Sequence, residues 1–93
     1  MSKNHDAYKS LLDRLELYTD WPSTYRFKFI FKTDEPQTGV TVESWFDETI
    51  DKRYIQSSAK NYQSLTIDVE METAEDVVEI YKKGAEIEGL VML

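Results

Sequence analysis

The sequence predicts an α+β domain in which two helices cover one face of a four-stranded antiparallel sheet, with a further helix at the N-terminus. Strict alternation in "YRFKFIFK" (25–32), a strand-turn-strand pattern over 50–71 and an amphipathic pattern over 73–87 carry this prediction. A period of two residues indicates strands, and a period of 3.6 indicates helices. The 93 residues, 41% of them hydrophobic, suit one domain with a single core.

The N-terminal stretch 4–18 is predicted to be an amphipathic helix. Its apolar residues recur at helical spacing: Tyr8, Leu11, Leu12 and Leu15. The helix should end before Pro22, because the residue preceding a proline avoids helical geometry. A helix of this length is marginal in water, so its apolar stripe must dock on the rest of the chain or on another subunit. We interpret residues 1–20 as an N-terminal extension and residues 21–93 as the domain.

The strand at 25–32 has aromatic residues on one face and cations on the other. The aromatic residues are Tyr25, Phe27, Phe29 and Phe31. The strand predicted at 62–71 supplies a matching apolar face: Leu65, Ile67, Val69 and Met71. An aromatic face could stack nucleic-acid bases or form the protein core. The exposed arrangement would bury Arg26, Lys28 and Lys32, which costs several kcal/mol for each unpaired charge. We therefore predict that the aromatic face is core.

The middle of the chain is predicted to contain one loop, one short helix and one strand. Pro36 and Gly39 mark a loop over 33–39, and the apolar spacing over 40–48 favours a short helix with Thr41 as its N-cap. A strand is predicted at 50–58, followed by a tight turn at 59–61.

The last helix, predicted over 73–87, has the clearest boundaries. Thr73 with Asp76 three residues later resembles a capping box, and Gly89 suits a C-terminal cap. The apolar stretch Leu90–Leu93 is predicted to be the fourth strand. The domain then reads β-α-β-β-α-β, which is typical of the ferredoxin-like fold with strand order 4-1-3-2.

Composition argues against several classes of function. The net charge is −7, from 11 basic and 18 acidic residues without a basic cluster, which disfavours nucleic-acid binding. There is no cysteine, the single histidine is His5 near the terminus, and the three glycines form no phosphate-binding loop. We therefore expect no catalytic residues, no metal and no cofactor. The N-terminus resembles no secretory signal and no apolar run could span a membrane, so we expect a cytoplasmic protein without membrane contact.

The stretch "SSAKNYQSLTI" (57–67), the "WP" before the aromatic strand, and "VVEIY" with the terminal "VML" resemble the YbeD-like family. These are uncharacterised small bacterial proteins of ferredoxin-like fold, and the resemblance covers residues 21–93. The sequence departs from the family at Lys60, where the family has a turn glycine, so a left-handed backbone there would be strained. The resemblance implies an architecture like that of ACT regulatory domains, which bind small molecules between paired domains.

Two functions stay open from the sequence. One is a non-catalytic regulatory module of ACT-like type that senses a small molecule. The other is a protein-interaction adaptor that uses a sheet edge, the open sheet face or the N-terminal helix. The candidate binding residues are Ser57, Ser58, Asn61, Tyr62 and Ser64. Their polar side chains are also typical of a hairpin turn, where they bond to nearby backbone. The apolar strand Leu90–Leu93 predicts a homodimer unless the N-terminal helix covers its second face.

Overall fold

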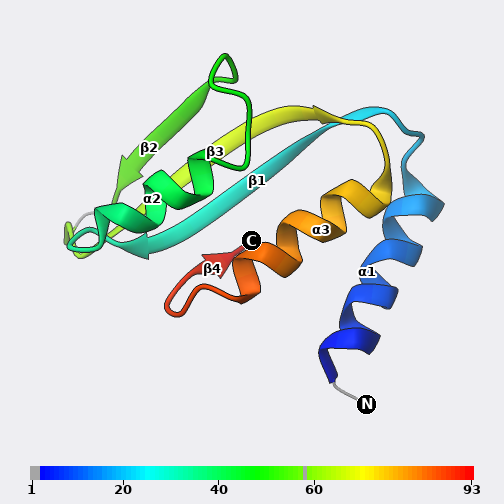
Figure 1. Cartoon of the computed structure of the whole chain (residues 1–93), viewed down its shortest axis with the longest axis horizontal. Coiled ribbons are helices and arrows are strands. Elements are labelled where there is room, and N and C mark those ends of the chain that lie inside the picture. The colour runs from blue at the N-terminus through cyan, green and yellow to red at the C-terminus, as the bar shows by residue number, and fades with distance from the viewer. Residues whose placement is uncertain (1–2, 58) are drawn as a thin grey trace.

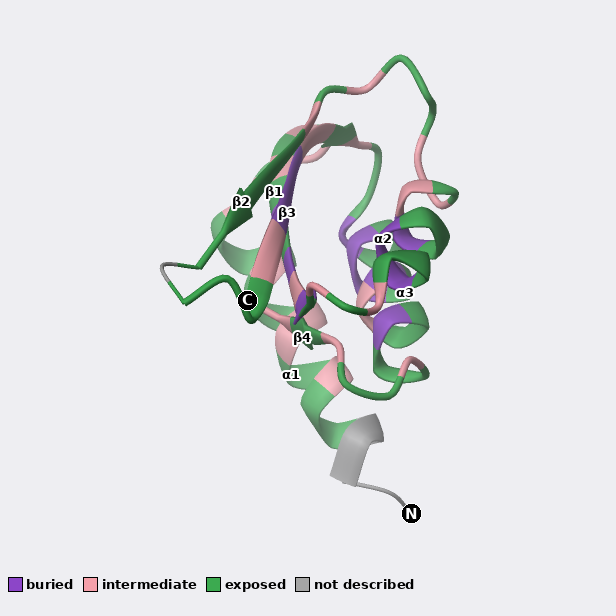
Figure 2. Cartoon of the chain, turned by 90° about the vertical axis from the view of Figure 1, so that its left-hand side faces the viewer, coloured by how far each residue is buried: buried purple, intermediate pink, exposed green. Residues whose placement is uncertain are grey.

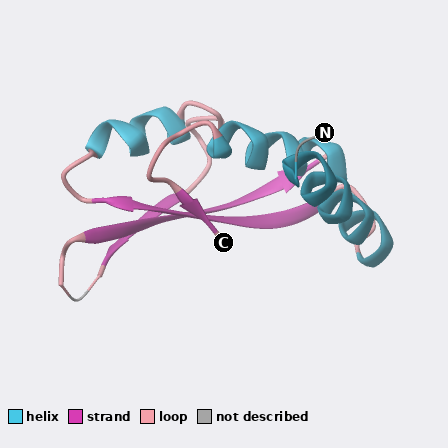
Figure 3. Cartoon of the chain, turned by 90° about the horizontal axis from the view of Figure 1, so that it is seen from below, coloured by secondary structure: helices cyan, strands magenta, loops and turns pink. Residues whose placement is uncertain are grey.

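The computed structural model describes residues 3–57 and 59–93, and these form three helices and one antiparallel four-stranded sheet (Figure 1). In chain order the elements are α1 (Lys3–Tyr18), β1 (Ser23–Lys32), α2 (Pro36–Glu43), β2 (Lys52–Gln56), β3 (Tyr62–Met71), α3 (Ala74–Ala85) and β4 (Val91–Met92). The sheet order is β2-β3-β1-β4, which reads 4-1-3-2 from the opposite edge. Figure 3 shows α2 and α3 over one face of the sheet, with α1 at its end beside α3.

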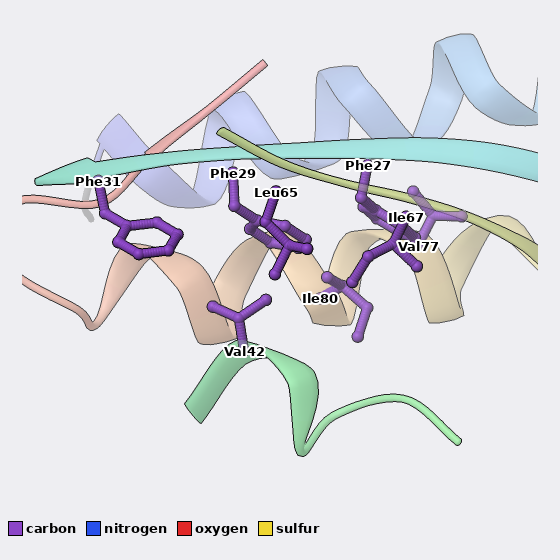
Figure 4. Close-up of a cluster of buried hydrophobic side chains, with 8 residues drawn as sticks. All are labelled: Phe27, Phe29, Phe31, Val42, Leu65, Ile67, Val77 and Ile80. Carbon is purple, nitrogen blue, oxygen red and sulfur yellow. The ribbon is translucent and has the colours of Figure 1, made fainter. Parts of the chain in front are cut away.

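The core lies between the sheet and these helices, and the aromatic face of β1 is its centre. Phe27, Phe29 and Phe31 are at most 1% exposed, which confirms the predicted orientation of the strand. In β3 the buried partners are Leu65 and Ile67, opposite Phe29 and Phe27 in the register. The helices add Val42, Val77 and Ile80 (Figure 4). Each such burial stabilises the fold by about 1.5–3 kcal/mol.

At one end of the core, the hydroxyl groups of two tyrosines, Tyr25 and Tyr81, lie beside each other. The hydroxyls of Tyr25 and Tyr81 lie 2.9 Å apart, within hydrogen-bond distance. Burial, and then this hydrogen bond, raises the pKa of the Tyr81 hydroxyl above its ordinary value. The pair joins β1 to α3 while leaving no buried hydroxyl unsatisfied.

Helix α3 begins as its sequence predicts. Thr73 is the N-cap, and its Oγ1 accepts a hydrogen bond of 3.1 Å from the backbone N–H of Asp76. The prediction for Gly89 was wrong, because the helix ends at Ala85 with Glu86 as its C-cap. Gly89 instead takes a positive φ of 85° in the turn that leads into β4, a geometry that glycine adopts without strain.

Helix α2 lies earlier in the chain than predicted. The expected loop over 33–39 and helix over 40–48 are replaced by a helix at Pro36–Glu43, and Thr41 lies inside it. Pro36 occupies the first turn, where its fixed φ suits a helix and its missing N–H has no intrahelical partner to lose. The proline therefore starts the helix and does not interrupt it.

The remaining strand boundaries differ by a few residues. Strand β2 spans Lys52–Gln56 and not the predicted 50–58, and β4 spans only Val91–Met92 within the predicted Leu90–Leu93. Figure 2 shows that the buried stretches belong to β1, β3, α2 and α3. Strand β2 is mostly exposed because it lies at an edge of the sheet.

Helix α1 packs beside α3, and its apolar stripe is half-buried. Leu15 contacts the core, and its carbonyl accepts a 3.2 Å hydrogen bond from Nε1 of Trp21. The ammonium of Lys82 lies 5.7 Å from the ring centroid of Tyr8. The stripe thus docks on the domain, as the sequence predicts. Among the residues described here, no helix is long and apolar enough to cross a membrane.

Candidate functional site

Of the predicted polar residues, Ser57, Asn61 and Tyr62 lie at the hairpin between β2 and β3. The backbone N–H of Ser57 donates to the carbonyl of Tyr62 over 2.8 Å, and Ser57 Oγ accepts from the Tyr62 N–H over 3.3 Å. Lys60 takes a positive φ of 62°, the left-handed geometry that the sequence predicts to be strained at this position. Both hydrogen bonds of Ser57 therefore stabilise the turn of the hairpin. Ser58 lies outside the described residues.

Asn61 and Tyr62 line an open depression of about 430 Å³ together with Lys32, Thr33 and Asp34. Thr33 joins the end of β1 to the hairpin: its N–H donates to the carbonyl of Asn61 over 3.1 Å, and its Oγ1 donates to that of Lys60 over 2.8 Å. The depression carries an ammonium, a carboxylate and an aromatic ring. Two of the five predicted residues thus share one concave surface.

Ser64 lies elsewhere, on the face of the sheet opposite α2 and α3, which we call the open face (Figure 3). The register places it in a row across all four strands, with Ile55 of β2 and Ile30 of β1 on either side, and Val91 of β4 beyond Ile30. We call these four residues the cross-strand row. With strands about 4.8 Å apart, the row is about 14 Å long. Ile55 is 62% exposed and Val91 is 52% exposed, so the row is an apolar strip open to solvent.

A second row runs parallel to the cross-strand row and combines cations with another apolar residue. Arg53 of β2 and Lys28 of β1 stand on either side of Thr66, which is only 7% exposed. The backbone N–H of Leu93 donates to the carbonyl of Lys28 over 3.0 Å, so Leu93 continues this row past β4, 64% exposed. The open face therefore joins exposed aliphatic groups to positive charge.

Next along the strands, one carboxylate holds two guanidinium groups. Asp68 accepts hydrogen bonds of 2.8 and 3.0 Å from Arg26 and a further one of 2.8 Å from Arg53. The bond to Arg26 lowers the pKa of the Asp68 carboxyl and raises the pKa of the Arg26 guanidinium. This cluster fixes the two arginines on the face. Among the described residues, Lys28 and Lys32 have no carboxylate within 4 Å.

The charge of the chain is divided unevenly between its surfaces. The described residues of the open face include four cations, Arg26, Lys28, Lys32 and Arg53, against two carboxylates, Asp68 and Glu70. The paired strand residues of this face therefore carry a net charge of +2. Because the whole chain carries −7, the rest of the molecule carries −9. A cationic, partly apolar face on an acidic protein is a surface suited to binding a partner.

Sequence reasoning identified Val91 and Leu93 as apolar residues in need of cover but missed Ile30 and Ile55. The sequence of β1 contained a signal for this apolar strip, because Ile30 interrupts the cations of the polar face. An aliphatic residue at a solvent-facing position of an alternating strand is unremarkable alone. Its meaning appears only when the register places Ile55 and Val91 in the same row.

Comparison with known proteins places the chain in a family. The chain matches no curated protein and no solved structure. The model of one family, described as a protein of unknown function (DUF493), matches residues 16–93, which includes every strand, α2, α3 and the end of α1. Because this match covers most of the chain, the protein belongs to the DUF493 family.

Proposed function

We propose that this chain is a non-catalytic protein-interaction module, with a ferredoxin-like fold of YbeD-like type, whose open sheet face binds a partner protein. The observation that carries the proposal is the cross-strand row, an exposed aliphatic strip bordered by cations. Apolar burial supplies affinity at such a surface, while the charges supply orientation and choice of partner.

The partner that fits this face has exposed apolar groups and acidic residues. The ammonium groups of Lys28 and Lys32, which form no ion pair within the described part of the chain, favour carboxylates opposite them. A second copy of the chain placed face to face would instead bring two net positive surfaces together. The electrostatic argument therefore favours a different protein over the homodimer.

The experiment compares two double variants that remove two exposed apolar side chains and add two negative charges. Ile55→Glu with Val91→Glu changes the open face, and Leu17→Glu with Val40→Glu changes exposed positions of α1 and α2. Cross-linking in the native cells followed by mass spectrometry measures the bound proteins. We expect one set of partners to be lost only with the open-face variant. Equal capture by both variants would overturn the proposal.

A second candidate function is the sensing of a small molecule at the hairpin depression, as in ACT-type regulation. The depression places Lys32 and Asp34 beside the half-exposed ring of Tyr62, a set of groups that suits a zwitterion such as an amino acid. A ligand that binds only the folded chain would raise its melting temperature, and the rise would continue with ligand concentration even beyond saturation of the site.

A panel of amino acids at millimolar concentration tests this second candidate by thermal shift. We expect stabilisation of the wild type and of Lys28→Ala, and none of Lys32→Ala, because only Lys32 lines the depression. If no amino acid of the panel changes the melting temperature of the wild type, the small-molecule function is refuted.

A further inference from the structure

We propose that the free edge of β1 binds an extended segment of the partner as an added antiparallel strand, an inference that rests on the proposed function. Strand β3 pairs with β1 along its whole length, from Ser23 to Lys32. On the other side, β4 pairs only with Phe29 and Ile30. Within the described chain, the N-terminal half of β1 is therefore a sheet edge without a neighbouring strand.

The direction of the backbone groups along this edge follows from one hydrogen bond. The carbonyl of Lys28 accepts from the N–H of Leu93, so the peptide groups of Lys28 face the side of β4. Groups of alternate residues in a strand face the same way, which turns those of Arg26 and Thr24 toward the free edge. No backbone bond to another described segment occupies them on this side. Unpaired edge groups of this kind accept a further strand.

The register predicts the length and side-chain pattern of that strand. A segment in line with β4 would lie opposite Phe27 through Ser23, five residues or about 17 Å. Its residue opposite Arg26 would point to the open face, between the guanidinium of Arg26 and the ammonium of Lys28, where a carboxylate fits. Its neighbours, opposite Phe27 and Tyr25, would point to the helix side.

On the helix side, a mostly apolar cavity of about 230 Å³ lies at the end of β4. Its lining residues come from α1, α3 and the β4 region: Tyr8, Tyr81, Gly84, Ala85, Leu90 and Met92. Tyr81 locates the cavity beside the free edge, because its hydroxyl contacts that of Tyr25 and donates to the carbonyl of Leu93 over 3.3 Å. One aliphatic side chain of an added strand would fit there. The segment is thus one in which aliphatic and acidic residues alternate.

The probe for this site is a capped peptide of alternating Val and Glu residues, and the matched peptide has N-methyl groups on the amides that would pair with β1. Titration calorimetry and amide chemical shifts measure their binding to the full chain. We expect only the unmethylated peptide to bind, with the largest shifts at Thr24 and Arg26. A wild-type chain that binds neither peptide, or both equally, would overturn the inference.

Protein variants separate backbone pairing from side-chain contact. Thr24→Pro removes an N–H that points to the free edge, where edge strands tolerate proline, while Thr24→Val retains it. We expect about tenfold weaker binding for the proline variant only. Lys28→Glu, which keeps the Asp68 cluster, should weaken the Val-Glu peptide and favour a Val-Lys peptide. If Thr24→Pro fails to fold, the N-methylated peptide still tests the backbone pairing, and this charge reversal tests the side-chain contact.

The two proposals fail in different ways. If the open-face double variant loses the cellular partners and Thr24→Pro keeps them all, the interaction module stands and the added strand is overturned. If Thr24→Pro loses them and the open-face variant does not, the edge binds but the open face does not. A dimer of the wild type that Thr24→Pro dissociates would show that the added strand comes from a second copy, which contradicts the choice of partner made here.

Discussion

At the scale of single residues, an odd or an even position in β1 decides whether a side chain lies in the core or on the open face. Phe27 and Phe29 are fully buried, whereas Lys28, between them in the chain, is exposed on the opposite face. Neighbouring residues therefore contribute to different properties. The aromatic residues stabilise the fold, and the cations and Ile30 form the surface that we propose binds a partner.

Phe29→Ala should lower the free energy of unfolding by about 3–5 kcal/mol, because it leaves a cavity among aromatic and aliphatic side chains. Lys28→Ala should change it by less than about 0.5 kcal/mol, since the ammonium has no ion pair in the described structure. Urea unfolding measures both. Similar losses for the two variants would contradict the assignment of core and open face.

The Asp68 cluster predicts a stability contribution that depends on pH. The pKa of this carboxyl is lowered in the folded protein, first by its hydrogen bond to Arg26. The contribution is therefore complete above the unfolded pKa of about 3.9 and is lost as the pH falls through the folded value. Asp68→Asn should be less stable than the wild type at pH 7, with a difference that shrinks below pH 4.

Urea midpoints at pH 7, 5 and 3 test this expectation. The control makes the same Asp68→Asn change in a chain that already carries Arg26→Gln and Arg53→Gln. Without the guanidinium partners, the substitution should have little effect that depends on pH. A stability difference that stays constant from pH 7 to pH 3 in the wild-type background would refute the role of the cluster.

At the scale of elements, α2 can approach the sheet closely because residue 39 has no side chain. A Cβ at Gly39 would lie 2.9 Å from the Tyr54 hydroxyl and 3.0 Å from Cζ of Phe31. The same hydroxyl of Tyr54 donates to Glu43 at the end of α2, and burial raises the pKa of this phenol. Helix α2 therefore packs against Phe31 of β1 and Tyr54 of β2 at the position of Gly39.

Gly39→Ala should destabilise the fold by about 1–3 kcal/mol, although alanine is the better helix former, because two rings must move. Gly84→Ala is the matched control in α3, where the added Cβ would meet the sulfur of Met92. That flexible side chain can move aside, so we expect a smaller loss. Thermal and urea unfolding should rank Gly39→Ala as the less stable variant, and the reverse order would refute the close approach of α2.

At the scale of the whole molecule, the uneven division of charge bears on self-association. The sequence predicts a homodimer from the apolar strand Leu90–Leu93, and α1 leaves Val91 and Leu93 at least half exposed. The open face that contains them is net positive, so two such faces repel at low ionic strength. This repulsion is a feature of the folded surface that composition does not reveal.

We expect light scattering to give a mass of 10.9 kDa over a dilution series at low salt, the mass of one chain. Because salt screens repulsion between exposed charges, any self-association through the open face should increase with ionic strength. A stable dimer at low salt that Val91→Glu dissociates would contradict this expectation and restore the homodimer.

The sequence by itself determined the local features of this protein. The alternation of β1, the hairpin and the cap of α3 depend on residues close together in the chain. The alternation and the cap occur as predicted, and the hairpin occurs with a shorter first strand. Local patterns failed where competing signals overlapped, as at Pro36, which can end one helix or begin another.

Only the tertiary structure decided what the open face presents. Ile30, Ile55 and Val91 are far apart in the chain, and strand pairing alone places them in one row. The same pairing joins Asp68 to two arginines and, among the described residues, leaves the N-terminal half of β1 paired on one side only. Such features depend on register and strand length, which long-range packing selects and which no local pattern of residues encodes.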